Sequence, residues 1–169
     1  MPVKLVAFGG SLRTDSFNKQ LARVAADFAR AAGAEVTVLD LKEWQLPIYD
    51  GDLEAAEGIP AKALELREIL KSHDGYIISS PEYNGSISAV LKNTIDWASR
   101  PREGEPGLVC FRGKTAALFA ASPGALGGLR GLTHVRAILS GIGVYLVPDQ
   151  FALSKANAAF DEAGGLKDQ

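Results

Sequence analysis

The chain has 169 residues, enough for a domain with a full hydrophobic core, and its 47% hydrophobic and 22% charged residues are ordinary for a soluble globular protein. The formal net charge is −2, and the lysines and arginines are scattered rather than clustered. This balance argues against nucleic acid or an anionic membrane surface as a partner. No apolar run approaches the ~20 residues that span a bilayer. We expect a cytoplasmic protein without a signal peptide.

The sequence offers little material for a metal site or a protein nucleophile. Cys110 is the only cysteine, and no histidine or aspartate lies next to it in the sequence. We interpret it as a small buried residue in a reducing compartment. The two histidines, His73 and His134, are isolated from each other and read as ordinary polar positions. We therefore predict no metal ion.

The first third of the chain predicts a strand, a helix and a second strand. Residues 4–8 form an apolar run that ends at a Gly-Gly pair, as expected of a buried parallel strand. A helix is expected over about residues 18–32, and residues 36–39 form the second strand. One apolar stripe at the i, i+3, i+4 and i+7 positions of this helix predicts its inner face: Leu21, Val24, Ala25 and Phe28.

The middle of the chain continues the alternation of strands and helices. Residues 44–51 contain too many breakers for regular structure. A helix is predicted from Pro60 to about Lys71, and a strand over residues 75–79. Ser86 or Ser88 can cap the next helix, which we expect to run through Ala98.

The last third predicts a strand over residues 115–121, a helix over about 132–140 and a strand over 144–147. Such alternation indicates a doubly wound parallel sheet with right-handed crossovers. We therefore predict an α/β fold with a five-stranded, flavodoxin-like sheet, formed by a single domain over residues 1–169. The short tail departs from this pattern: residues 156–160 suffice for a turn or two of helix, and residues 166–169 resemble the start of a last helix that the fold normally has.

The loop after the first strand has the composition of an anion site. Ser11, Thr14, Ser16 and Asn18 offer side-chain donors, and Arg13 adds a fixed cationic fork. The loop leads into a helix whose first N–H groups are unpaired, where a phosphate fits well. It is neither a Walker A loop nor a dinucleotide Gly-x-Gly-x-x-Gly loop.

Two further loops follow the third and fourth strands, so they lie at the same carboxyl edge. The first, Pro81-Glu82-Tyr83-Asn84-Gly85, combines a rigid proline, an aromatic ring and a sharp turn, and suits a flat ligand. The N–H groups of Tyr83 and Asn84 are candidates to bond the edge of a ring. The second loop, residues 122–128, is rich in glycine, which lets backbone approach a ligand closely. A phosphate site beside a site for a planar ring indicates a mononucleotide, and FMN fits best.

The same residues resemble the NAD(P)H-dependent FMN reductase family, which includes soluble quinone, azo-dye and chromate reductases. The resemblance rests on three segments that span nearly the whole chain: residues 10–18, residues 81–100 and residues 122–128. It implies that the first segment holds the FMN phosphate, that the second lines the isoalloxazine ring and that the third lies near its far side. The residues carried over are Ser11, Arg13, Ser16, Phe17 and Asn18 for the phosphate, Pro81, Glu82, Tyr83 and Asn84 for the ring, and Ser122 for the far side.

We thus expect an oxidoreductase in which bound FMN passes electrons from NAD(P)H to a small acceptor: a quinone, an azo compound, a metal oxyanion or free flavin. The flavin carries the chemistry, so no side chain is assigned as acid, base or nucleophile. A one-electron carrier of the flavodoxin type is an alternative, although such carriers tend to be strongly acidic. A non-redox module of the same fold would need clustered acidic residues after the first strand, where Gly9-Gly10-Ser11 stands instead.

The resemblance also implies a homodimer or homotetramer. Two features of the sequence favour the same expectation. One sheet face would lack the cover of a last helix, and Trp97 lies one step off the inner stripe of its predicted helix, where its ring could face a neighbour. The sequence does not distinguish NADH from NADPH and does not name the physiological acceptor.

Overall fold

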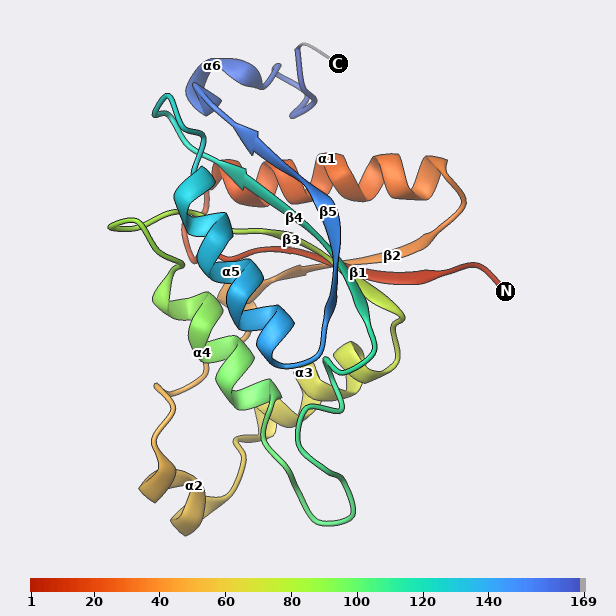
Figure 1. Cartoon of the computed structure of the whole chain (residues 1–169), viewed down its shortest axis with the longest axis vertical. Coiled ribbons are helices and arrows are strands. Elements are labelled where there is room, and N and C mark those ends of the chain that lie inside the picture. Colours follow the sequence, from red (N-terminus) through yellow and green to blue (C-terminus); the bar gives the residue numbers. More distant parts are fainter. Residues whose placement is uncertain (168–169) are drawn as a thin grey trace.

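The computed structural model describes residues 1–167, and its five strands form one parallel sheet in the order β2-β1-β3-β4-β5 (Figure 1). This is the strand order of flavodoxin-like folds, so the predicted fold class is confirmed. The strands are β1 Lys4–Gly9, β2 Glu35–Asp40, β3 Gly75–Ser79, β4 Thr115–Ala121 and β5 Tyr145–Leu153. The helices are α1 Phe17–Ala31, η1 Leu41–Glu43, α2 Gly51–Glu57, α3 Ala61–Lys71, α4 Ala89–Ala98, α5 Leu129–Gly141 and α6 Ala156–Ala159.

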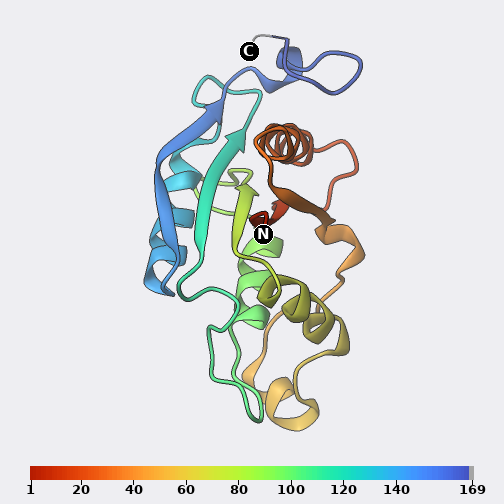
Figure 2. The same ribbon diagram turned by 90° about the vertical axis from the view of Figure 1, so that its right-hand side faces the viewer.

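The sheet is covered differently on its two faces (Figure 2). Helices α3, α4 and α5 cover one face and enclose the largest apolar cluster, which includes Leu66, Leu91 and Leu132. On the other face lie α1 and the segment after β5, with two smaller clusters. All five residues of the central strand β3 are buried, as expected for a parallel strand with both faces covered.

The buried face of helix α1 includes Leu21, as predicted, but differs from the predicted stripe at its other positions. Leu21, Ala22 and Ala26 are buried, whereas Phe28 is 57% exposed, so the prediction that Phe28 faces the core is wrong. The small residues on the buried stripe let the helix lie close to the sheet. Phe28 consequently points to the side, toward the part of this face that α1 does not cover.

The prediction that Trp97 faces a neighbouring subunit is also wrong. Trp97 is fully buried, and its Nε1 donates a 2.8 Å hydrogen bond to the carbonyl oxygen of Pro47. The ring of Tyr49 meets it edge-on, with the ring centroids 5.0 Å apart. The connection before α2 therefore folds over α4 and covers the indole, a long-range contact that helical periodicity does not reveal.

Two predicted boundaries at the end of the chain need correction. Strand β5 does not stop at Val147 but continues through Pro148 to Leu153, with a register irregularity opposite β4 between Ala116 and Leu118. Proline is tolerated there because β5 is an edge strand and the register is already interrupted. Leu166 pairs with Phe160 in an isolated antiparallel bridge and does not begin a helix, while residues 168 and 169 of that predicted helix lie outside the described residues.

Candidate functional site

The first predicted loop joins the carboxyl end of β1 to α1. Ser16 caps the helix by accepting a hydrogen bond from the N–H of Lys19 at 3.4 Å. A Cβ on Gly9 would lie 2.7 Å from the nitrogen of Lys19, so only glycine lets the first turn of α1 approach the strand end this closely. Within residues 1–167, the N–H groups of Phe17 and Asn18 have no hydrogen-bond acceptor. The loop therefore presents unpaired donors at the positive end of a helix dipole.

The side chains of this loop divide into a buried and an exposed group. Ser11 and Ser16 are 3% and 4% exposed, and Ser11 accepts a hydrogen bond from the N–H of Arg13. Arg13 is exposed, and in the described part of the chain its guanidinium has neither a hydrogen bond nor an ion pair. The ring of Phe17 stacks on that of Phe160, with centroids 6.2 Å apart. Arg13 is thus the cationic group of this loop that is available to an anion.

Asn18 is buried and its amide is already committed. Its Nδ2 donates to the carbonyl oxygen of Ala121 at 2.8 Å, and its Oδ1 accepts from the N–H of Ala121 at 2.9 Å. The hydroxyl of Ser79 donates to the same Oδ1 at 2.9 Å. The side chain joins α1 to the ends of β3 and β4, so its role is to hold the loop in place, and the backbone N–H of Asn18 is the donor we consider for a ligand.

The second predicted loop forms a tight two-residue turn. Asn84 and Gly85 both have positive φ, 52° and 75°, and the backbones of Tyr83 and Ser86 exchange two hydrogen bonds around them. This is the geometry that favours Asn-Gly. Two N–H groups were expected to bond a ring edge. That of Tyr83 is used in the turn, whereas that of Asn84 has no acceptor within residues 1–167. The Tyr83 side chain is 50% exposed and stands at the surface of the loop.

Glu82 anchors the beginning of α5. Its Oε2 accepts from the N–H groups of Arg130 and Gly131 at 3.1 and 3.3 Å, and its Oε1 accepts from Arg130 Nε at 2.8 Å. Burial of the carboxylate opposes its ionisation, but the hydrogen bonds from the Arg130 side chain and the Gly131 N–H hold the pKa of Glu82 below its ordinary value. The carboxylate is therefore ionised at neutral pH and positions the loop against α5.

The first two loops are in direct contact. Ser88, which caps α4, donates its hydroxyl proton to the carbonyl oxygen of Gly10 at 2.6 Å. A Cβ on Gly10 would lie 3.3 Å from Cδ of Pro81, a buried residue of the second loop. The loops that carry the candidate anion site and the candidate ring site thus pack against each other at the carboxyl edge of β1 and β3.

A cleft of about 570 Å³ brings the second loop together with the third. It is lined by Glu82, Asn84, Gly85, Ser122, Gly124, Ala125, Leu126, Gly127, Gly128 and Arg130. Gly127 and Gly128 have φ values of +61° and +90°. A Cβ on Gly127 would lie 2.7 Å from the backbone of Ala152, so glycine is required for this path of the chain.

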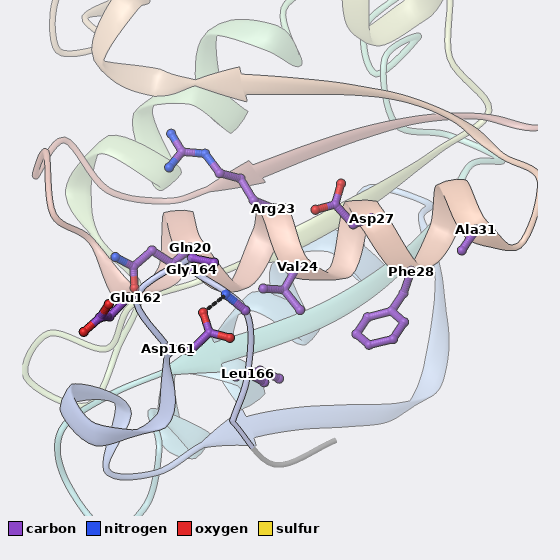
Figure 3. Close-up of a pocket in the computed structure, with 12 residues that line it drawn as sticks. Gln20, Arg23, Val24, Asp27, Phe28, Ala31, Asp161, Glu162, Gly164 and Leu166 are labelled. Atoms are coloured by element: carbon purple, nitrogen blue, oxygen red, sulfur yellow. Dashed lines mark hydrogen bonds between the residues drawn. The ribbon is translucent and has the colours of Figure 1, made fainter.

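A second cavity, of about 700 Å³, lies between α1 and the segment 161–166 (Figure 3). Helix α1 forms one wall with Val24, Asp27 and Phe28, and the segment 161–166 forms the other. It contains none of the predicted site residues. Among residues 1–167, no cluster of three or more His, Cys, Asp or Glu side chains is placed to hold a metal ion, and no helix is long and apolar enough to cross a membrane.

With this geometry in view, the comparisons with known proteins give a consistent result. The family profile described as NADPH-dependent FMN reductase matches residues 3–158. The chain belongs to this family. It is 36% identical over 167 residues to an NAD(P)H-dependent FMN reductase of Pseudomonas aeruginosa, a match that covers 98% of this chain and 85% of the relative. It is 39% identical over 137 residues to a quinone reductase of Escherichia coli, covering 81% and 69%.

A solved structure supports the same family. The flavoenzyme NAD(P)H:(acceptor) oxidoreductase FerB from Paracoccus denitrificans aligns with a TM-score of 0.79 and 29% identity, over 98% of this chain and 87% of FerB. The resemblance and the assignment as an oxidoreductase are therefore confirmed, together with FMN and NAD(P)H as the cofactor and co-substrate of the family.

Two features of the candidate site were not predicted from the sequence. Arg130 was not predicted to lie near it, yet it lines the cleft and contacts Glu82. The only available signal was its place two residues after the Gly-Gly pair of the third loop. The structural role of the Asn18 side chain was also missed, because it depends on a partner 103 residues away in the sequence.

Proposed function

We propose that this chain is an FMN-dependent oxidoreductase that takes electrons from NAD(P)H and delivers them to a small acceptor. The observation that carries the proposal is the contact between the two loops. The first loop carries N–H groups and an Arg13 guanidinium that have no partner within residues 1–167, and the adjacent second loop lines the cleft of about 570 Å³. A ligand that combines a phosphate with a flat ring system matches these two neighbouring loops.

Each predicted residue has a role compatible with its surroundings. For the phosphate we propose Arg13, the N–H groups of Phe17 and Asn18, and the hydroxyls of Ser11 and Ser16. For the ring we propose the Asn84 N–H, the exposed face of Tyr83, and the backbone held in place by Pro81 and Glu82. Ser122 lies across the cleft from this loop. All of these belong to one flavodoxin-like domain, which we take to be residues 1–169.

FMN, when bound, supplies the redox chemistry, and the protein's part is to hold and orient it and to admit the reactants. Glu82 accepts hydrogen bonds from two N–H groups and the Arg130 guanidinium at the start of α5, so the role we give it is to position the loop. We assign no side chain as acid, base or nucleophile.

For the acceptor we propose a quinone first. Several relatives are named for quinones, among them the quinone reductase of Escherichia coli and a 2-hydroxy-1,4-benzoquinone reductase of a Burkholderia species, the latter 35% identical over 147 residues. A flat quinone also suits a cleft that four glycines help to line, because glycine lets a ligand approach the backbone closely. Azo compounds, metal oxyanions and free flavin are the other acceptors to assay.

Steady-state kinetics with NAD(P)H and a quinone test the proposal. With the flavin ring held at this cleft, the nicotinamide and the quinone would use the same open face of the ring in turn, so double-reciprocal plots should be parallel, as in a ping-pong scheme. Intersecting lines would show a ternary complex and contradict shared use of the cleft. Absence of any nicotinamide oxidation by the FMN-loaded protein would contradict the proposed function itself.

We further propose that the protein is a homodimer or homotetramer. Exposed aromatic side chains on the α1 side of the sheet support this: Phe28 is 57% exposed, and Phe151, which contacts Phe119, is 44% exposed. Light scattering of the FMN-loaded protein at micromolar concentration tests it, and a mass near the 17.9 kDa of one chain would rule it out. We also propose that it acts in the reducing cytoplasm, which suits the free, buried thiol of Cys110.

A further inference from the structure

Arg130 is a cation at a position where local structure does not favour one. It is the second residue of α5, whose first turn contains no acidic residue. A positive charge there opposes the helix dipole. Its side chain is 67% exposed and lines the cleft between the second and third loops. The ion pair with Glu82 offsets this cost, and the exposed position of the guanidinium leaves it within reach of a ligand in the cleft.

Glu82 contacts the guanidinium of Arg130, but its carboxylate also has hydrogen bonds that do not depend on this side chain. One carboxylate oxygen, Oε2, is satisfied by the backbone N–H groups of Arg130 and Gly131. The other, Oε1, takes the guanidinium through Nε at 2.8 Å and Nη2 at 2.5 Å. If the guanidinium turned toward the cleft, Glu82 would keep two hydrogen bonds. Nη1 of Arg130 has no partner within residues 1–167, so part of the cationic fork already faces solvent.

The site has two arginines, Arg13 and Arg130, and only Arg13 is assigned to the phosphate of FMN. Arg130 and Glu82 are the only charged side chains among those that line the cleft. Arg13 lies in the other loop, where the proposed function places the single phosphate of FMN. The donor, NAD(P)H, brings additional phosphates to the same cleft. Resting on the proposed function, we infer that Arg130 binds a phosphate group of the nicotinamide donor and thereby sets the affinity of the enzyme for that donor.

The experiment compares Arg130→Ala with three matched variants of the FMN-loaded protein. Arg130→Lys keeps the charge but loses the planar fork. Glu82→Gln removes the charge partner but not the guanidinium. Arg112→Ala removes one exposed positive charge from the loop before β4, at the opposite edge of the sheet. The donors are NADPH, NADH and the phosphate-free 1-benzyl-1,4-dihydronicotinamide, and calorimetry measures the binding of NADP⁺ and, separately, of FMN.

Arg130→Ala should weaken NADP⁺ binding and raise KM for NADPH by on the order of tenfold, as expected for one exposed charge-assisted contact. The rate with the phosphate-free donor and the affinity for FMN should stay within about twofold of the wild type. Arg130→Lys should be intermediate. Glu82→Gln should not reproduce the selective loss for phosphate-bearing donors, and Arg112→Ala should resemble the wild type. An equal loss for NADH and NADPH assigns Arg130 to the diphosphate, and a loss for NADPH alone assigns it to the 2′-phosphate.

Three results would overturn the inference. Unchanged NADP⁺ binding in Arg130→Ala would remove the residue from the donor site. An equal loss with the phosphate-free donor, matched by Glu82→Gln, would show that Arg130 acts only by holding the second loop. A wild-type protein that binds FMN yet oxidises none of the three donors would reject the proposed function and this inference together, whereas either of the first two results leaves the proposed function standing.

Discussion

Asn18 and Ala121 are joined by a reciprocal pair of hydrogen bonds, in which the Asn18 side chain donates to the Ala121 carbonyl at 2.8 Å and accepts from its N–H at 2.9 Å. The pair connects the first turn of α1 to the last residue of β4, immediately before Ser122. One buried amide thus sets the position of the phosphate loop relative to the third loop.

Asn18→Ala should destabilise the protein even without FMN. The change leaves the N–H and carbonyl of Ala121 and the hydroxyl of Ser79 without their partner in a buried place, which should cost about 2–4 kcal/mol of unfolding free energy. Urea unfolding of the apoprotein measures this. Stability equal to wild type, combined with weaker FMN binding, would instead make the Asn18 side chain a ligand contact.

Arg13→Ala should show the opposite pattern. Because the guanidinium has no partner in the described chain, apoprotein stability should stay within about 0.5 kcal/mol of wild type. FMN affinity should fall by roughly tenfold to a hundredfold, the range for a charge-assisted hydrogen bond to phosphate. Titration of the apoprotein with FMN checks this, with Arg112→Ala as the control for loss of one positive charge. An unchanged affinity would remove Arg13 from the site.

The parts of the site that the sequence could predict are those determined by neighbouring residues. The Ser88 cap, the Asn-Gly turn and the donor-rich loop are local signals, and the structure has the cap and the turn where they were predicted. The hydrogen-bond partners of the Asn18 side chain could not be predicted, because they lie on the distant strands β3 and β4. Arg130 was missed for the same reason, since the Glu82 that locates it is 48 positions away.

The fold shows the same division between local and long-range information. Strands β3 and β4 begin and end at the predicted residues because apolar runs bounded by breakers determine them locally. Trp97 was misplaced because the cover over it comes from the distant connection at Pro47. Phe28 was misplaced because apolar spacing favoured a stripe of large residues, whereas close packing on the sheet selected Ala22 and Ala26.

Riboflavin should bind much more weakly than FMN, by on the order of a hundredfold, because it lacks the phosphate that the first loop is proposed to hold. Arg13→Ala should narrow this difference by weakening FMN alone. Calorimetry of the apoprotein with both flavins provides the test. Equal affinities for the two flavins in the wild type would disprove the phosphate assignment.

Glu105 should make stability sensitive to acid. Hydrogen bonds from Arg102 and Lys71 lower its pKa to about 2 in the folded protein, from about 4.3 in an unfolded chain. A depressed folded pKa means that the unfolded state binds more protons in this window. The contribution of Glu105 is therefore fully present above pH ~4.5 and is lost as the pH falls toward ~2.

Glu105→Gln should consequently be less stable than wild type at neutral pH and lose less stability between pH ~4.5 and ~2. Unfolding measured across that range checks both effects. Glu103→Gln, which changes an exposed neighbour, is the matched control. Parallel pH profiles for wild type and Glu105→Gln would contradict the role given to the Arg102 and Lys71 contacts.

The most direct test of the central claim is an anaerobic spectroscopic titration of the purified protein loaded with FMN. The protein should bind one FMN per chain, NADH or NADPH should bleach the visible absorption of the flavin, and a quinone added afterwards should restore it. A protein that binds no FMN, or whose bound FMN keeps its absorption with both nicotinamide donors, would contradict the assignment as an NAD(P)H-dependent FMN oxidoreductase.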